Sequence, residues 1–347
     1  MIRFAWLQSR SQTLVVLAAL AGLAVVAAVT GVQLSHYYAS HVAHCRTGCD
    51  LLTEQFSNRQ GFLQRAFDLL AQVVPALVGI FWGAPLLARE LESGTHRLAW
   101  TQGVTRTRWL AARLGVMTLV TLVVTGVLSL AITWWSRDLD RVSSNQYALF
   151  DRRDLAPVAY ALFALTLGVL LGGALRRTLP AMAGTLVAFV VTRVVTSLWV
   201  RPHLLAAHHL TTALGAGRFG IASRNGSALT LVADSSGPAE SWRLSTHLVN
   251  SAGHRPSSSE LAAFLHQYCA DVGLPPPSVG SNHVARVVGP DSGRQCLDAA
   301  SRTFHNVVTY LPADRYWPLQ WLEVAVFLGL ALLATGGAFW WVARRTS

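Results

Sequence analysis

Six apolar stretches divide this chain of 347 residues, and each is long enough to cross a lipid bilayer as an α-helix. An α-helix rises about 1.5 Å per residue, so about 20 residues cross the hydrocarbon core of a membrane. The sequence therefore predicts an all-α membrane protein with six transmembrane helices, in the plasma membrane. The predicted spans are Thr13–Leu34, Leu69–Ala88, Leu114–Trp135, Leu155–Leu175, Leu179–Val200 and Leu319–Val342.

The charged residues are distributed unequally between the two sides of these spans. Counted alternately from the N-terminus, one set of connecting segments carries 11 arginines and two acids, a net charge of +9. The other set carries 16 arginines and 14 acids, a net charge of +2. Because basic residues in short loops mark the cytoplasmic face, we expect both termini in the cytoplasm. The overall charge of +11 then reflects topology, and no nucleic-acid partner is expected.

The predicted spans divide the chain into four regions. Residues 1–12 form a cytoplasmic interfacial segment, and residues 13–200 hold spans one to five with a cytoplasmic loop at 89–113. Residues 201–318 form a mixed extracellular domain, and residues 319–347 hold span six and a cytoplasmic tail. In the extracellular domain we expect a capped helix from Ser257 to about Val272, a helix over Ser292–Tyr310 and a strand over Ala228–Ala233.

All four cysteines lie in segments assigned to the outer side, where thiols oxidise. Two disulfides are therefore expected, and three connectivities are possible. We prefer the pairing of chain neighbours, Cys45 with Cys49 and Cys269 with Cys296, and leave the other two connectivities open. Histidines cluster near the first pair, but oxidised cysteines do not bind metal, so no metal site is expected.

The loop 89–113 contains the two acids of the inner side, Glu90 and Glu92. Its segments Ala88–Thr95, Leu98–Gln102 and Thr105–Trp109 resemble the integral-membrane permeases of ABC exporters, the type-2 family, in their actinobacterial form. Two weaker matches extend the resemblance over nearly the whole chain. They are Arg201–His203, after span five, and Arg315–Gln320, before span six.

The resemblance implies the membrane-spanning permease subunit of an ATP-driven exporter. It implies two partners, a separate ABC ATPase subunit and a second permease subunit in a homodimer or heterodimer. It also implies that the loop after span two contacts the ATPase, through Arg89, Glu90, Glu92, Thr95, Arg97, Arg106 and Arg108. The chain contains no lysine and therefore no Walker A motif, so we expect no cofactor here and ATP bound by the partner.

Two charged residues lie inside predicted spans, Arg193 in span five and Glu323 in span six. A charge within a span costs about 2.5–3.5 kcal/mol on insertion scales and is usually paired or turned inward. These residues therefore predict a polar pair near the translocation path or, alternatively, side chains that extend to the outer headgroups.

An enzyme is not expected, because the sequence offers no catalytic motif within the spans. The pair Glu92 and His96 lies in a predicted loop and lacks the His-Glu-x-x-His pattern of a metalloprotease. The alternative to a permease is a non-transporting membrane sensor or assembly protein, whose extracellular domain would bind a ligand.

Overall fold

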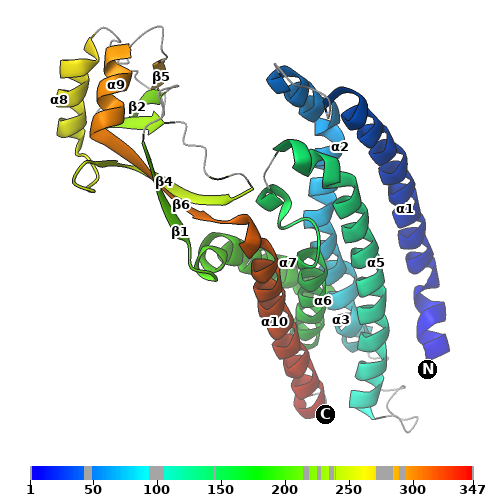
Figure 1. Cartoon of the computed structure of the whole chain (residues 1–347). Coiled ribbons are helices and arrows are strands. Elements are labelled where there is room, and N and C mark those ends of the chain that lie inside the picture. Colours follow the sequence, from blue (N-terminus) through cyan, green and yellow to red (C-terminus); the bar gives the residue numbers. More distant parts are fainter. Residues whose placement is uncertain are drawn as a thin grey trace. The chain divides into compact units, whose positions relative to one another are not determined.

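The computed structural model describes residues 2–42, 49–93, 105–143, 146–213, 219–224, 228–233, 238, 240–270, 284–288 and 294–345. The chain forms two compact units. Unit 1 contains Met1–Leu204 and Tyr316–Ser347, and unit 2 contains Leu205–Arg315. Unit 1 is a helical bundle, whereas unit 2 combines two small sheets with helices (Figure 1). The boundaries of unit 2 lie within a few residues of the predicted 201–318 domain.

The helices of unit 1 coincide with the predicted spans. The first is covered by α1 (Ile2–Tyr37), which continues as the π-helix η1 (Tyr38–Val42). The second is covered by α2 (Cys49–Leu77), the π-helix η2 (Val78–Gly83) and α3 (Ala84–Ser93). The others are covered by α5 (Arg106–Ser143), α6 (Ala156–Leu175), α7 (Thr178–Val195) with the π-helix η4 (Thr196–Val200), and α10 (Tyr316–Arg345).

Five helical stretches among the described residues are long and apolar enough to cross a membrane. They correspond to predicted spans two to six, while a crossing by α1 stays a prediction. Because α1 begins at Ile2, residues 2–12 continue directly into the first predicted span and do not form a separate helix. The five stretches are Gly61–Ser93, Arg106–Arg137, Ala156–Leu175, Thr178–His203 and Ala313–Arg344.

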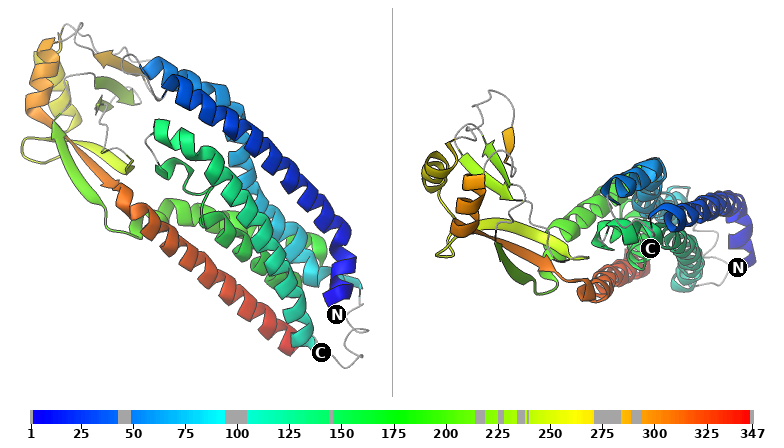
Figure 2. Two further views of the ribbon diagram at one scale, coloured as in Figure 1. Left: turned by 45° about the vertical axis from the view of Figure 1, so that its right-hand side comes forward. Right: turned by 45° about the horizontal axis from the view of Figure 1, so that its top comes forward.

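The helix α6 is the centre of unit 1 and packs against α2, η2, α3, α5, α7 and α10. Figure 2 shows these helices side by side. Small residues allow the close contact with the second span: a Cβ atom on Gly168 would lie 2.7 Å from the nitrogen of Ala84, and one on Gly79 would lie 2.7 Å from the oxygen of Ala164. Small residues are common where two membrane helices approach each other closely.

The bundle has two ends that we name for reference. Helix α1 begins, and α10 ends, at the same end of the bundle, which we call the near end (Figure 2). The opposite end is the far end. Toward the far end, α1, α2 and α5 share an apolar cluster that includes Leu34, Phe67, Ile132 and Trp135.

Unit 2 contains two three-stranded antiparallel sheets. The first has the order β1 (His208–Ala213), β6 (Phe304–Leu311), β4 (Trp242–Asn250), and the second has the order β3 (Ala228–Ala233), β2 (Phe219–Arg224), β5 (Val284–Val288). The predicted strand Ala228–Ala233 is confirmed as β3. Two helices, α8 (Ser258–Tyr268) and α9 (Arg294–Thr303), form an apolar core with Phe304 of β6.

The predicted helix Ser292–Tyr310 is wrong beyond Thr303. There α9 ends, and Phe304–Leu311 form β6, the central strand of the first sheet. The segment contains adjacent β-branched residues and aromatic side chains, which favour strands, and Phe304, Asn306 and Val308 alternate as buried positions. Pairing with β1 and β4 on its two sides therefore outweighs the helical spacing seen in the sequence.

The capped helix begins as predicted and ends earlier. The Ser257 hydroxyl accepts a hydrogen bond from the Glu260 backbone nitrogen at 3.2 Å, which satisfies one of the free N–H groups at a helix start. The helix α8 ends at Tyr268 instead of near Val272. Cys269 follows with non-helical backbone angles, φ −124° and ψ 23°.

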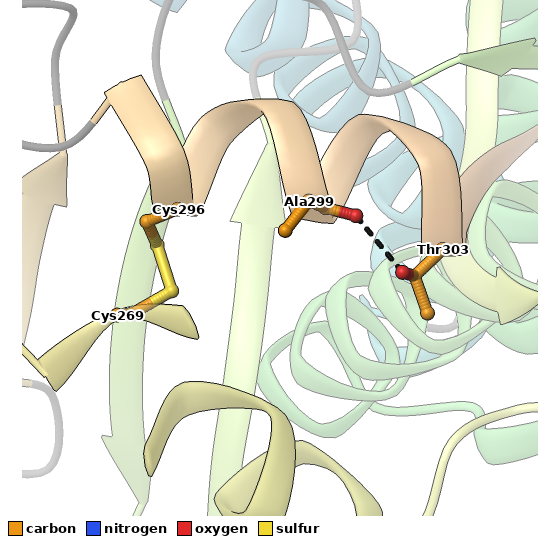
Figure 3. The surroundings of a disulfide bond; sticks show 4 residues. All are labelled: Cys269, Cys296, Ala299 and Thr303. Atoms are coloured by element: carbon orange, nitrogen blue, oxygen red, sulfur yellow. Dashed lines mark hydrogen bonds between the residues drawn. A yellow bond between two sulfur atoms is a disulfide. The ribbon is translucent and has the colours of Figure 1, made fainter. Parts of the chain in front are cut away.

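A disulfide joins Cys269, after α8, to Cys296 on α9 (Figure 3). The two Cα atoms are 4.7 Å apart, and both residues are buried in the core between the helices. This confirms one of the two predicted pairs. Cys45 lies outside the described residues, so the pairing of Cys45 with Cys49 stays a prediction.

We predict that protein isolated without reductant has no free thiol, because both pairs are expected to be oxidised. Alkylation of the denatured chain followed by mass spectrometry measures this directly. No cysteine should be modified before reduction, and all four should be modified after it. Modification of Cys45 and Cys49 without reductant would refute the second disulfide while leaving the first intact.

Candidate functional site

Glu323 is completely buried on α10, and groups from elsewhere in the bundle hold its carboxylate. Arg201 donates from Nε to Oε2 at 2.7 Å and from Nη2 to Oε1 at 2.8 Å. The Tyr160 hydroxyl, on α6, donates to Oε1 at 2.5 Å. An intramembrane carboxylate is expected to be paired in this way, because an isolated charge in hydrocarbon is costly. Glu323 therefore links α10 to α6 and to η5 (Arg201–His203), which follows η4.

Asp151 and Arg193 complete what we call the charge network, together with Tyr160, Arg201 and Glu323. Asp151, in the segment before α6, forms an ion pair with Arg201. Arg193 on α7 lies 3.7 Å from Asp151 and 3.6 Å from Glu323, and its guanidinium lies 3.5 Å from the centroid of the Tyr160 ring. The two acids balance the two arginines, which limits the cost of burying them.

The sequence identified two of these five residues. It singled out Arg193 and Glu323 because they lie inside spans, and the structure places them 3.6 Å apart within the bundle. It missed Asp151, Tyr160 and Arg201. One signal was present, since a buried Glu323 requires a cation, and Arg201 directly follows span five. That the network lines a translocation path stays a prediction.

A second group of polar contacts fixes the segment before α6 to α10. Arg153 donates from Nε to the Tyr316 hydroxyl at 3.2 Å, and Tyr316 in turn donates to Asp154. Gln320 donates to the Phe150 carbonyl at 3.0 Å. Tyr316 and Gln320 belong to the matched segment Arg315–Gln320, and Arg201 belongs to Arg201–His203. The two weaker matched segments thus contribute to neighbouring polar contacts at the far end.

At the near end, both acids of the predicted coupling loop make contacts within the chain. Glu90 on α3 pairs with Arg113 on α5, and both side chains are about four-fifths buried. Glu92 Oε2 accepts hydrogen bonds from the backbone nitrogen of Thr178 at 3.0 Å and from its hydroxyl at 2.7 Å. Thr178 is the first residue of α7, so Glu92 satisfies a free N–H at that helix start and complements its dipole.

These contacts connect the end of α3 to the starts of α5 and α7, that is, the end of span two to spans three and five. Of the other predicted contact residues, Arg89 and Arg108 are exposed and Arg106 is partly buried. Thr95 and Arg97 belong to the range 94–104, which lies outside the described residues.

Comparison with known families identifies the membrane part of the chain. A family model described as ABC-2 membrane transporter related matches residues 17–201, slightly more than half of the chain. The chain belongs to the ABC-2 membrane transporter related family. The matched region of this ABC-2 family member includes the contacts of Glu90 and Glu92 and four residues of the charge network, Asp151, Tyr160, Arg193 and Arg201. No curated protein and no solved structure matches the chain.

Proposed function

We propose that this protein is the membrane-spanning permease subunit of an ATP-driven, ABC-type exporter of the actinobacterial form. The observation that carries the proposal is the family match over residues 17–201, supported by five apolar stretches of spanning length. The chain contains no lysine and so no Walker A motif, which means that a separate ABC ATPase subunit binds ATP. The chain itself is not an enzyme and holds no cofactor. Both termini, and the near end, lie in the cytoplasm.

The near-end contacts support a role for α3 and the loop after it in coupling. An ATPase subunit that docks on the loop 89–113 moves the end of α3 when it binds and hydrolyses ATP. The Glu90–Arg113 ion pair transmits this movement to α5, and the hydrogen bonds from Thr178 to Glu92 transmit it to α7. The exposed Arg89 and Arg108 remain available for the ATPase surface.

A second permease subunit, identical or homologous, completes the transporter. One face of α7 and η4 carries a row of apolar side chains that are exposed among the described residues. In the membrane such a face contacts lipid or another apolar helix, and we propose the second subunit there. The row comprises Leu186, Val187, Val190, Val191, Val194, Val195 and Leu198.

The coupling role predicts the behaviour of the double variant Glu90→Gln with Glu92→Gln. The variant should insert in normal amounts, because both residues follow Ala88, the last fully buried residue of α3, and glutamine keeps the size of each side chain. It should recover about 10-fold less ATPase subunit on co-purification, because contacts of about 1.5–3 kcal/mol each hold the end of α3, where the ATPase docks, to Arg113 and Thr178. Alternatively, it should retain the ATPase and lose transport-stimulated ATP hydrolysis.

A matched control is Glu240→Gln, which changes an exposed acid of unit 2 and should behave as the parent. Thr178→Val separates the two contacts, because it removes the hydroxyl donor to Glu92 and leaves the Glu90–Arg113 pair intact. If the double variant binds the ATPase and transports like the parent, coupling takes place elsewhere in the chain.

A further inference from the structure

Arg201 and Arg193 share the same two carboxylates unequally. Arg201 donates two short hydrogen bonds to Glu323 and pairs with Asp151. Arg193 reaches those same carboxylates only at 3.6 and 3.7 Å, beyond hydrogen-bonding distance. Its Nη1 atom is buried and has no hydrogen-bond partner among the described residues. A buried donor left without an acceptor is unfavourable, so short hydrogen bonds from Arg193 to these carboxylates would stabilise it.

A π-helical turn, η4, separates the two arginines along the chain. The Arg201 backbone nitrogen donates to the Thr196 carbonyl, five residues earlier, and the Thr196 nitrogen donates to the carbonyls of both Thr192 and Arg193. A π-helical turn contains one residue more than an α-helical turn and is often found at functional sites. If that extra residue passes to a later turn, the residues between the two turns move by about 1.5 Å along the axis and rotate by about 100°.

We propose that η4 is a two-state element, and that its change of register transfers Glu323 and Asp151 from Arg201 to Arg193. In the present state Arg201 holds both carboxylates. In the second state Arg201 moves just beyond hydrogen-bonding distance and Arg193 forms the short hydrogen bonds. Arg193 already lies over the Tyr160 ring, and a movement of under about 1 Å brings its nitrogen atoms within hydrogen-bonding distance.

Charge balance makes the second state accessible. In each state one arginine forms short hydrogen bonds with the carboxylates, while the other remains nearby. No carboxylate is left buried without a cation, which is the costly outcome for an intramembrane acid. The two arrangements are discrete because the hydrogen-bonding registers of π- and α-helical turns are discrete, as expected of a switching element.

The consequence for transport rests on the proposed function. Helix α7 is bonded to Glu92 at its near end and leads into η4 at its far end. A displacement of α7 that begins at the coupling loop therefore reaches η4 and favours one register over the other. Arg193 acts as a positioning residue, since its hydrogen bonds to Glu323 and Asp151 stabilise the second register of η4.

Distance measurement between spin labels on the purified full-length chain in lipid nanodiscs tests the transfer. One label replaces Trp199, at the end of η4, and the other replaces Trp321 on α10, where both side chains are exposed. Cys45→Ser and Cys49→Ser keep the labels specific. A control pair at Val187 and Leu332, exposed on α7 and α10, reports positions before the π-helical turn.

Arg201→Gln should favour the second state and shift the Trp199–Trp321 label distance by about 3 Å or more, with no shift in the control pair. Arg193→Gln should keep the parent distance, because it removes only the alternative partner. Arg201→Lys keeps the charge but cannot form the bidentate contact with Glu323, so it should shift the distance in the same direction even if Arg201→Gln does not fold.

The proposal is overturned if neither Arg201→Gln nor Arg201→Lys shifts the distance, or if Arg193→Gln shifts it as much as Arg201→Gln. The measurement needs no ATPase subunit, so such a result leaves the proposed function standing. Conversely, failure of the Glu90 and Glu92 variants to affect the ATPase would remove the transport consequence and leave the two-state element intact.

Discussion

Glu323→Gln should lower the free energy of unfolding of the full-length chain by about 3–5 kcal/mol. This range is typical when one partner of a buried ion pair is removed and the other stays charged. Here the substitution leaves the buried guanidinium of Arg201 with Asp151 as its remaining acidic partner, while Arg193 also loses a neighbouring negative charge. Denaturant or thermal unfolding in nanodiscs, followed by tryptophan fluorescence, measures the loss.

The matched control is Asp314→Asn, which removes an acid of similar chemistry from an exposed pair. Asp314 lies 3.9 Å from Arg315, and its side chain is 75% exposed. Exposed pairs contribute about 0–1 kcal/mol, so the control should unfold nearly as the parent does. Equal stability of Glu323→Gln and Asp314→Asn would contradict the charge network as a structural element of the bundle.

Gly168→Leu should destabilise the bundle by at least the roughly 1–3 kcal/mol typical of overpacking, and it should reduce the amount of inserted protein. The added side chain meets backbone atoms of the second span, including the Ala84 nitrogen at 2.7 Å from the first added carbon. Backbone cannot move aside as a flexible side chain can, so α6 has to separate from η2 and α3.

Gly329→Leu on α10 is the control, because a Cβ atom there meets nothing within 4 Å. It should unfold and insert like the parent. If Gly168→Leu is as stable as Gly329→Leu, the close contact between α6 and the second span does not contribute to stability, and the described packing of the bundle is wrong at its centre.

Predicted spans two to six agree with apolar helices of spanning length, because hydropathy is summed over about 20 residues and single exceptions matter little. The packing of the spans was not predictable, since it depends on which small residues face each other. Gly168 and Gly79 look alike in the sequence to Gly329, yet only the first two contact another backbone. The same limit applies to β6, where local helical spacing gave no indication of pairing with β1 and β4.

The candidate site was predictable only in part, because the sequence shows unusual charges but not their partners. Glu90 and Glu92 stood out as the two acids of a basic inner face, and Glu323 as a charge within a span. Their partners are distant in the chain: Arg113 is 23 residues from Glu90, Thr178 is 86 from Glu92, and Arg201 is 122 from Glu323. Such separations carry no spacing pattern, so these contacts required the fold.

Isolation of the tagged full-length chain from its native membranes, with an assay of ATP hydrolysis, tests most directly the claim that it is a transporter permease. We predict that an ATPase with a Walker A motif co-purifies in a fixed ratio to the permease chain. The preparation should hydrolyse ATP, and substitution of the Walker lysine in that ATPase should abolish hydrolysis without dissociating the complex. An intact chain isolated without such an ATPase, and without ATP hydrolysis, would contradict the claim and favour a membrane sensor or assembly protein.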